Sequence, residues 1–265
     1  MKEKQKIILN STILYVIAFL LTTIIHEFGH AIIGLINGGE PILHHNYVEY
    51  LNIDNLRISQ KITISLAGPV LSLIQGILIG LIFIKIQKQS LFKLFLLWLS
   101  VLGLSNFFGY LMTGPIFQKG DIGKVFFLTN TPLILQIIIA VIGTAILFYI
   151  AYKLTLPFLE FCNKKECISD AKLRENFAFG IIIIPWIAGA IIVTILYLPV
   201  IAIVSIIYPI TSGMIFIFPW KNAKRITNLK ISKVNNIGEY SFGLYLIFII
   251  SLVVFKYILA PGIIL

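Results

Sequence analysis

The chain has 265 residues, of which 58% are hydrophobic and 12% are charged, and its net charge is +10. Several apolar runs exceed the roughly 20 residues that cross a bilayer, which excludes a soluble enzyme and predicts a membrane protein. The Lys and Arg residues lie mainly between these runs. This distribution of basic residues is typical of the loops of membrane proteins, so we expect no nucleic-acid partner.

Seven apolar segments predict an all-α polytopic membrane protein with about seven transmembrane helices. They are Ile7–Ile36, Ile62–Ile84, Leu91–Phe117, Leu133–Tyr152, Phe179–Tyr197, Val200–Phe218 and Phe242–Leu259. We expect the third of them to end early or to re-enter the membrane. After the first span, polar and apolar residues partly alternate over Tyr47–Leu51, which predicts a short β-hairpin or a re-entrant segment.

The basic residues divide unevenly between the two sides that alternating spans define. The set that includes Lys2, Lys4 and Lys6 holds sixteen of them, and the opposite set holds five. Cytoplasmic loops carry the excess of Lys and Arg, so we expect a multi-pass protein of the cell membrane with a cytoplasmic amino terminus. Cys162 and Cys167 then fall in a cytoplasmic loop, where reduced thiols are expected.

The first apolar segment carries the residues that are most informative about function. His26, Glu27 and His30 stand in Ile7–Ile36, which contains no Lys, Arg or Asp. Positions i and i+4 share a helix face, so both imidazoles can bind one metal ion, and Glu27 can take a proton from a water on that ion. Polar groups are costly inside an apolar span, and a metal site is favoured over a metal-free polar patch.

A catalytic zinc site needs a third protein ligand and an open position. The candidates are Asp121, Glu40, Glu49, Asp54, His44 and His45. Asp121 is favoured, because its turn follows the third span and so emerges on the membrane side where the first span ends. The flanking Gly120 and Gly123 let the backbone turn tightly there. Adjacent histidines seldom bind one ion together, so we expect a surface role for His44 and His45.

Three segments in the first half of the chain follow one another in an order that a known family also uses. The HExxH motif of residues 26–30 is followed by Ser65–Pro69 at the start of the next span. Asn106, Gly114-Pro115 and Gly120-Asp121 come with and after the third span. This pattern resembles the site-2 protease family of intramembrane zinc metalloproteases, over about Ile7 to Thr129.

The resemblance implies one Zn²⁺ ion held by His26, His30 and Asp121, with Glu27 as the general base. It also implies that Asn106 steadies the substrate or the oxyanion, although an Asn in a span is on its own typical of interhelical hydrogen bonding. Residues 1–130 would form a metalloprotease core of three spans, and residues 131–265 a membrane region of about four. The family usually has Asn where this chain has Ser72.

The expected function is therefore the hydrolysis of peptide bonds in or next to the transmembrane segments of membrane proteins. The partners would be a membrane-protein or membrane-peptide substrate and the lipid bilayer. The alternative is a polytopic membrane protein without proteolytic activity, such as a metal-binding pseudoprotease or a transporter or binding component. Glu27 separates the two, because a site that only binds metal has no use for a base.

Overall fold

The computed structural model describes residues 3–162, 170–199, 203–227 and 237–265. Within them, six helical stretches are long and apolar enough to cross a membrane, which confirms the predicted all-α membrane fold. They are α1 (Glu3–Ile36), α2 (Ile58–Lys85), α3 (Leu91–Thr113), α5 with α6 (Leu133–Lys153, Thr155–Leu159), α8 with η2 and α9 (Ala171–Ala178, Phe179–Ile183, Ile184–Leu196), and α12 with η5 (Phe242–Val253, Val254–Leu259). A short helix, α4 (Asp121–Leu128), follows α3.

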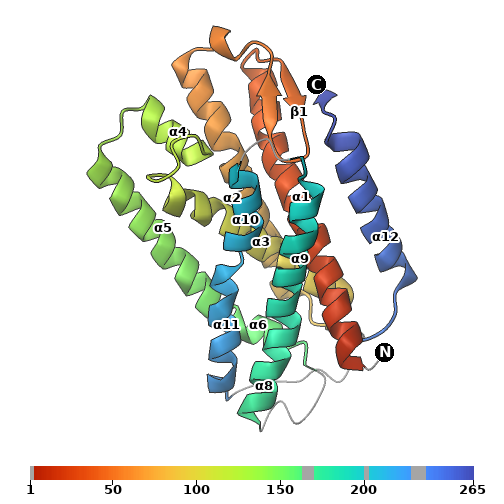
Figure 1. Cartoon of the computed structure of the whole chain (residues 1–265). Helices are drawn as coiled ribbons and strands as arrows, with labels where there is room; N and C mark the ends of the chain where they lie inside the picture. The colour runs from red at the N-terminus through yellow and green to blue at the C-terminus, as the bar shows by residue number, and fades with distance from the viewer. Residues whose placement is uncertain (1–2, 163–169, 200–202, 228–236) are drawn as a thin grey trace.

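The predicted span Val200–Phe218 differs from the expectation of one continuous helix. Its described part consists of short helices: α10 (Ile203–Thr211), η3 (Met214–Phe216) and α11 (Ile217–Asn222), followed by η4 (Ala223–Arg225). Pro209 removes one backbone donor from α10, and a Cβ at Gly213 would overlap the indole of Trp186 on α9. Figure 1 shows α10 and α11 following one another along the bundle, so together they trace a broken crossing.

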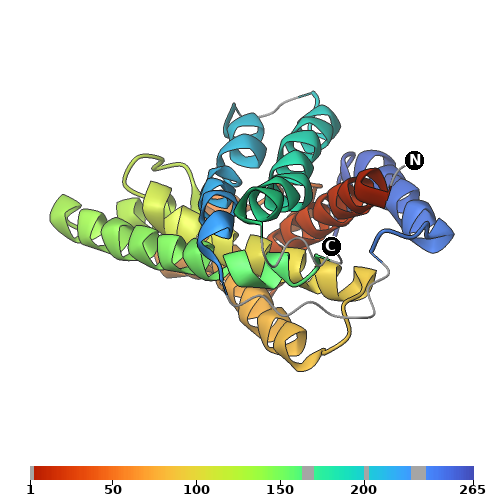
Figure 2. The same cartoon turned by 90° about the horizontal axis from the view of Figure 1, so that it is seen from below.

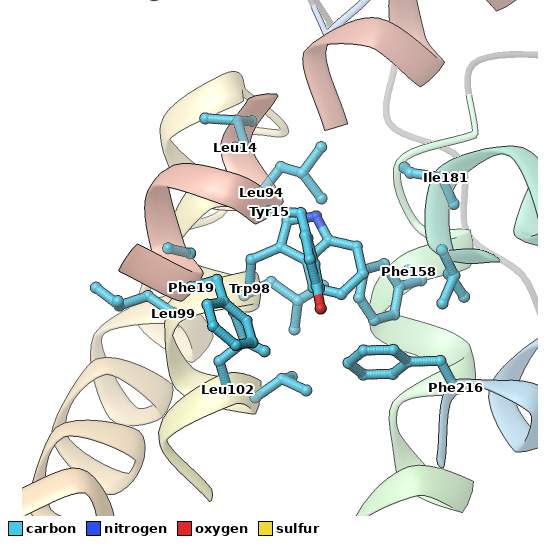
Figure 3. Packing of buried hydrophobic residues seen from close by; sticks show 14 of the residues in the cluster. Leu14, Tyr15, Phe19, Leu94, Trp98, Leu99, Leu102, Phe158, Ile181 and Phe216 are labelled. Atoms are coloured by element: carbon cyan, nitrogen blue, oxygen red, sulfur yellow. The ribbon is translucent and has the colours of Figure 1, made fainter. Parts of the chain in front are cut away.

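Helix α1 lies in the interior of the bundle, in contact with α2, α3, α9 and α12. Aromatic side chains from four parts of the chain meet around it, as Figure 3 shows. Tyr15 and Trp98 meet edge to face with ring centroids 5.0 Å apart, and Phe158 and Phe216 pack against the same indole. The Trp98 Nε1–H donates to Ser11 Oγ, so the one polar group of this indole is satisfied.

Outer helices leave much of their aliphatic surface uncovered. In Figure 2, α5 stands at the edge of the bundle, and only 11% of the most apolar 18-residue stretch of α5 and α6 is buried. An exposed apolar face of this length would be unfavourable in water and is what a hydrocarbon environment accepts.

The predicted hairpin is confirmed, and it belongs to a three-stranded antiparallel sheet. Strand β1 (Pro41–Leu43) pairs with β2 (Val48–Tyr50) on one side and with β3 (Ile263–Ile264), near the carboxyl end, on the other. A 3₁₀ turn, η1 (Ile53–Asn55), leads from the hairpin into α2.

This pairing corrects the expected surface role of His44 and His45, since both side chains are buried. The His44 ring stacks on Tyr47, and its Nδ1 lies 3.2 Å from the carbonyl oxygen of Ala260. The His45 ring packs edge-on against Phe255 of η5. The covering residues come from the far end of the sequence, and so no local pattern indicated this burial.

The two ends of α1 lie at opposite ends of the molecule. At its start, Glu3 lies beside Gly238, which precedes α12, and at its far end the hairpin meets β3. Figure 1 accordingly shows the amino and carboxyl ends of the chain at opposite ends of the bundle. Near the amino-terminal end, Cys162 is buried and disulfide-bonded, so the expected reduced thiol is wrong for it. Cys167 lies outside the described residues.

Candidate metal centre

His26 and His30 lie one turn apart on the face of α1 that meets α2. Both side chains are buried, with 2% and 7% of their residue surface exposed, and their Nε2 atoms are 3.1 Å apart. The helices approach closely at this turn, because a Cβ added at Gly29 would lie 2.7 Å from the carbonyl oxygen of Ala67. The i, i+4 spacing thus places two imidazoles in a close interface between helices.

Asp121, the first residue of α4, completes the cluster. Its Oδ2 atom lies 2.9 Å from His26 Nε2 and 3.3 Å from His30 Nε2. Gly123 is needed for this approach, since a Cβ there would overlap the carbonyl oxygen of Phe117. The structure therefore brings together the three residues that the sequence proposed as ligands. Among the described residues, this buried cluster is the group of His, Cys, Asp and Glu side chains that could hold a metal ion.

Hydrogen bonds on the far side of each imidazole determine what faces the centre. His30 Nδ1 lies 2.7 Å from the carbonyl oxygen of Ile64, which can only accept, so Nδ1 carries a proton and the neutral ring presents its lone pair at Nε2. His26 Nδ1 lies 3.2 Å from Ser72 Oγ, which can play the same part. Metal-bound histidines are oriented by partners of this kind.

The donor set fits a metal ion. In the neutral tautomers described above, two imidazole lone pairs and a carboxylate oxygen face one another at 2.9 to 3.3 Å. Ligands about 2.0–2.1 Å from a tetrahedral ion stand about 3.3 Å apart, so the observed triangle has nearly the required size. The metal-free alternative is an ion pair of Asp121 with protonated imidazole, since its Oδ2 lies within 3.3 Å of both Nε2 atoms.

Helix α2 contributes a glycine and a serine to the cluster. A Cβ added at Gly68 would overlap His30 Nε2 and lie 2.7 Å from His26 Nε2. Ser72 is one turn further on the same face and is fully buried. Sequence reasoning noted Ser72 only as a departure from the family, although its i+4 spacing from Gly68 indicated that it faces the same space.

Two tyrosines that sequence reasoning missed also hold the cluster. The Tyr110 ring on α3 stacks on the His26 imidazole, with centroids 5.2 Å apart and planes 11° apart. From β2, the Tyr50 hydroxyl donates to the backbone carbonyl of His30 at 2.7 Å. Tyr110 follows Asn106 by one helical turn, and that spacing was the available signal.

Glu27 lies next to the cluster and faces a small polar cavity of about 60 Å³, room for a few water molecules. It is buried, and its carboxylate makes no hydrogen bond or ion pair with another described residue. The cavity is lined by Thr23, His26, Glu27, Asn46, Asn106, Tyr110, Tyr197 and Tyr208. Two of these residues come from the second half of the chain, so the surroundings of Glu27 are not built by residues 1–130 alone.

Asn106 lines the same cavity as Glu27 and His26, and it also bonds to another helix. Its Nδ2 donates to the Tyr208 hydroxyl on α10 at 2.9 Å. The two interpretations of Asn106 from the sequence, a group near the site and an interhelical partner, are thus compatible.

The remaining candidate ligands lie elsewhere. Glu40, Glu49 and Asp54 are exposed on the segment around the hairpin. The buried His44 has its Nε2 atom 3.7 Å from a carboxylate oxygen of the exposed Glu49. None of them joins the cluster.

No family model, curated protein or solved structure matches this chain.

Proposed function

We propose that this protein is an intramembrane zinc metalloprotease. One observation carries the proposal: His26, His30 and Asp121 converge on one point inside the helical bundle, with the Glu27 carboxylate beside them. Two imidazoles, one carboxylate and an open position are the ligand set of hydrolytic zinc sites. A zinc ion held there would supply a Lewis acid that polarises a carbonyl and acidifies water.

Glu27 is the group of this chain that moves the proton. It faces a cavity that can hold water, and no described residue competes for its carboxylate. In peptide hydrolysis it would accept a proton from the attacking water and then deliver it to the leaving amine. His30 and His26 keep their Nε2 atoms aimed inward through Ile64 and Ser72.

The membrane setting supports a substrate that also lies in the membrane. The cluster is carried by a helix whose neighbours expose aliphatic faces, and no soluble domain is present among the described residues. A peptide helix shields its own backbone groups, so a transmembrane substrate has to unwind locally before its carbonyl can reach the centre.

The alternative function is metal binding without hydrolysis. It requires His26, His30 and Asp121 but gives Glu27 no part. Burial of an unpaired carboxylate next to a metal cluster is costly for a protein that does not use it. For this reason we favour the protease.

The test measures zinc and proteolysis separately. Protein purified in detergent is analysed for zinc as wild type, Glu27→Gln and Asp121→Asn, and cleavage of co-expressed single-span membrane proteins is followed on gels. We expect Glu27→Gln to retain zinc and to lose turnover by about 10²–10⁴-fold, the usual contribution of a general base. The exposed Glu49→Gln is the matched control. Full turnover in Glu27→Gln would exclude the protease, and zinc retained by a cleavage-negative wild type would favour the binding protein.

A further inference from the structure

The cavity beside Glu27 contains polar atoms whose hydrogen-bonding capacity is not used within the described structure. Asn106 is 4% exposed, and its Oδ1 atom is buried without a hydrogen-bond partner. Its Nδ2 donates to the Tyr208 hydroxyl, so this hydroxyl acts as acceptor there and keeps its own hydrogen. No acceptor among the described residues lies within hydrogen-bond distance of that hydrogen. Buried polar atoms nearly always have hydrogen-bond partners in folded proteins. The free acceptor of Asn106 and the free donor of Tyr208 therefore indicate that a hydrogen-bonding ligand binds here.

Tyr208 and Asn106 together present one donor and one acceptor side by side. The hydrogen bond from Asn106 Nδ2 to the Tyr208 hydroxyl, 2.9 Å long, holds the two side chains together, and both residues line the cavity that His26 and Glu27 also line. An extended peptide residue exposes its own N–H and C=O on the same side, as in a β-strand. The pair is therefore complementary to the backbone of one extended residue, whatever its side chain.

The position of Asn106 and Tyr208 along the bundle also fits a site for substrate backbone. Asn106 precedes Tyr110 by one helical turn, about 5.4 Å, and Tyr110 stacks on the imidazole of His26. Extended chain advances about 3.3 Å per residue. A peptide whose scissile carbonyl lies at the metal cluster would thus place a neighbouring residue at the level of Asn106 and Tyr208.

We infer that Tyr208 and Asn106 form a substrate-backbone site, in which the Tyr208 hydroxyl donates to a carbonyl and Asn106 Oδ1 accepts an N–H of one extended substrate residue beside the scissile bond. The inference rests on the proposed function. It adds that the second half of the chain supplies a substrate-binding residue.

The experiment compares two zinc-binding probes by calorimetry on zinc-loaded, full-length protein. Acetohydroxamate carries only the metal-binding group. N-acetyl-alanyl-leucine hydroxamate adds, next to the metal-binding group, an alanine whose own N–H and C=O are both available. We expect Tyr208→Phe and Asn106→Leu each to weaken binding of N-acetyl-alanyl-leucine hydroxamate about 5–10-fold, the value of one hydrogen bond, and to leave acetohydroxamate affinity unchanged.

Tyr245→Phe is the matched control, because the Tyr245 hydroxyl also bonds to an asparagine, Asn10, but far from the cavity. It should change neither affinity. Equal loss of both probes in Tyr208→Phe, or no loss of either, would overturn the backbone site while the proposed function stands. Failure of wild type to bind acetohydroxamate would instead overturn the proposed function, and the backbone site with it.

Discussion

Gly68 is the residue at which α2 comes closest to the two imidazoles. A single methyl group there would occupy the space of His30 Nε2 and approach His26 Nε2 to 2.7 Å. The neighbouring helices leave little freedom for the rings to retreat, since His30 Nδ1 is bonded to Ile64 and the His26 ring is stacked on Tyr110. The absence of a side chain is thus part of the site's chemistry.

Gly68→Ala should therefore lower zinc affinity by at least about tenfold, a size usual for displaced metal-site geometry. Competition with a calibrated chelator would measure it. Gly109→Ala on α3 is the control, because a Cβ at Gly109 meets nothing within 4 Å and alanine favours a helix. Equal zinc affinity in Gly68→Ala and wild type would mean that the ion is not held where the imidazoles meet.

Ser72→Ala tests the outer support of His26. Loss of the hydroxyl that faces Nδ1 at 3.2 Å leaves this ring free to change tautomer. We expect zinc affinity to fall about 10-fold or more, with the protein still folded. Ser251→Ala removes an exposed serine hydroxyl on α12 for comparison. If Ser72→Ala binds zinc as tightly as wild type, Ser72 does not orient the ligand.

The three residues of the cluster could be predicted from the sequence, because helix periodicity and the alternation of spans were enough to bring them together. The i, i+4 spacing fixes His26 and His30 on one face, and the third span returns Asp121 to the same end of the molecule. Ser72 and Tyr208 were not singled out as site residues, because an isolated polar residue in a span has many structural roles. Metal binding and catalysis remain predictions.

At the scale of elements, the hairpin was predicted and its burial was not. Alternation over Tyr47–Leu51 indicated a strand, but the sheet has its third strand at residues 263–264, more than 200 positions away. The broken crossing was missed in a different way. Pro209 and Gly213 are visible in the sequence, yet only the packing of Gly213 on Trp186 shows why the helix stops there.

Burial of the hairpin predicts a dependence of stability on pH through His45. Burial, and then the nearby charges of Lys256 and His44, lowers the pKa of His45 to about 4. The unfolded chain, with a His pKa near 6.5, takes up a proton that the folded chain refuses. Stability is therefore complete above about pH 6.5 and falls as the pH drops toward 4.

The expected loss from this residue is about 2 kcal/mol between pH 7 and pH 5. Denaturant unfolding in detergent at both pH values, for wild type and His45→Phe, isolates it. The variant should lose less stability than wild type by about that amount. An identical loss in both proteins would show that folding does not lower the pKa of His45.

At the scale of the whole molecule, Figure 1 shows the two chain ends at opposite ends of the bundle. Among the described residues, six helical stretches are long and apolar enough to cross a membrane, and α10 with α11 adds a broken crossing. Sixteen of the basic residues belong to the loop set that includes the amino terminus. We therefore propose that the amino terminus is cytoplasmic and that the metal cluster lies toward the outer face. The disulfide at Cys162 argues for the reverse, because cytoplasmic thiols are normally reduced.

Labelling of intact cells decides between these orientations. In a background with Cys162→Ser and Cys167→Ser, single cysteines replace Lys119, beside the cluster, and Lys88, at the opposite end, both of them exposed. A membrane-impermeant thiol reagent should label Lys119→Cys and not Lys88→Cys. The inverse result would give priority to the disulfide and place the cluster near the cytoplasm.

The turn between α3 and α4 has a consequence for how this chain tolerates change in length. Gly114 packs against Phe126, and α4 rests on the Phe117 carbonyl, so residues 114–120 contain no spare backbone. The length of α3 therefore sets the position of Asp121. Deletion of one residue would move the end of the helix by about 1.5 Å and rotate it by about 100°. Asp121 would move away from the imidazoles. Insertions or deletions in α3 should therefore disrupt the metal cluster far more than insertions or deletions in the linker at residues 86–90.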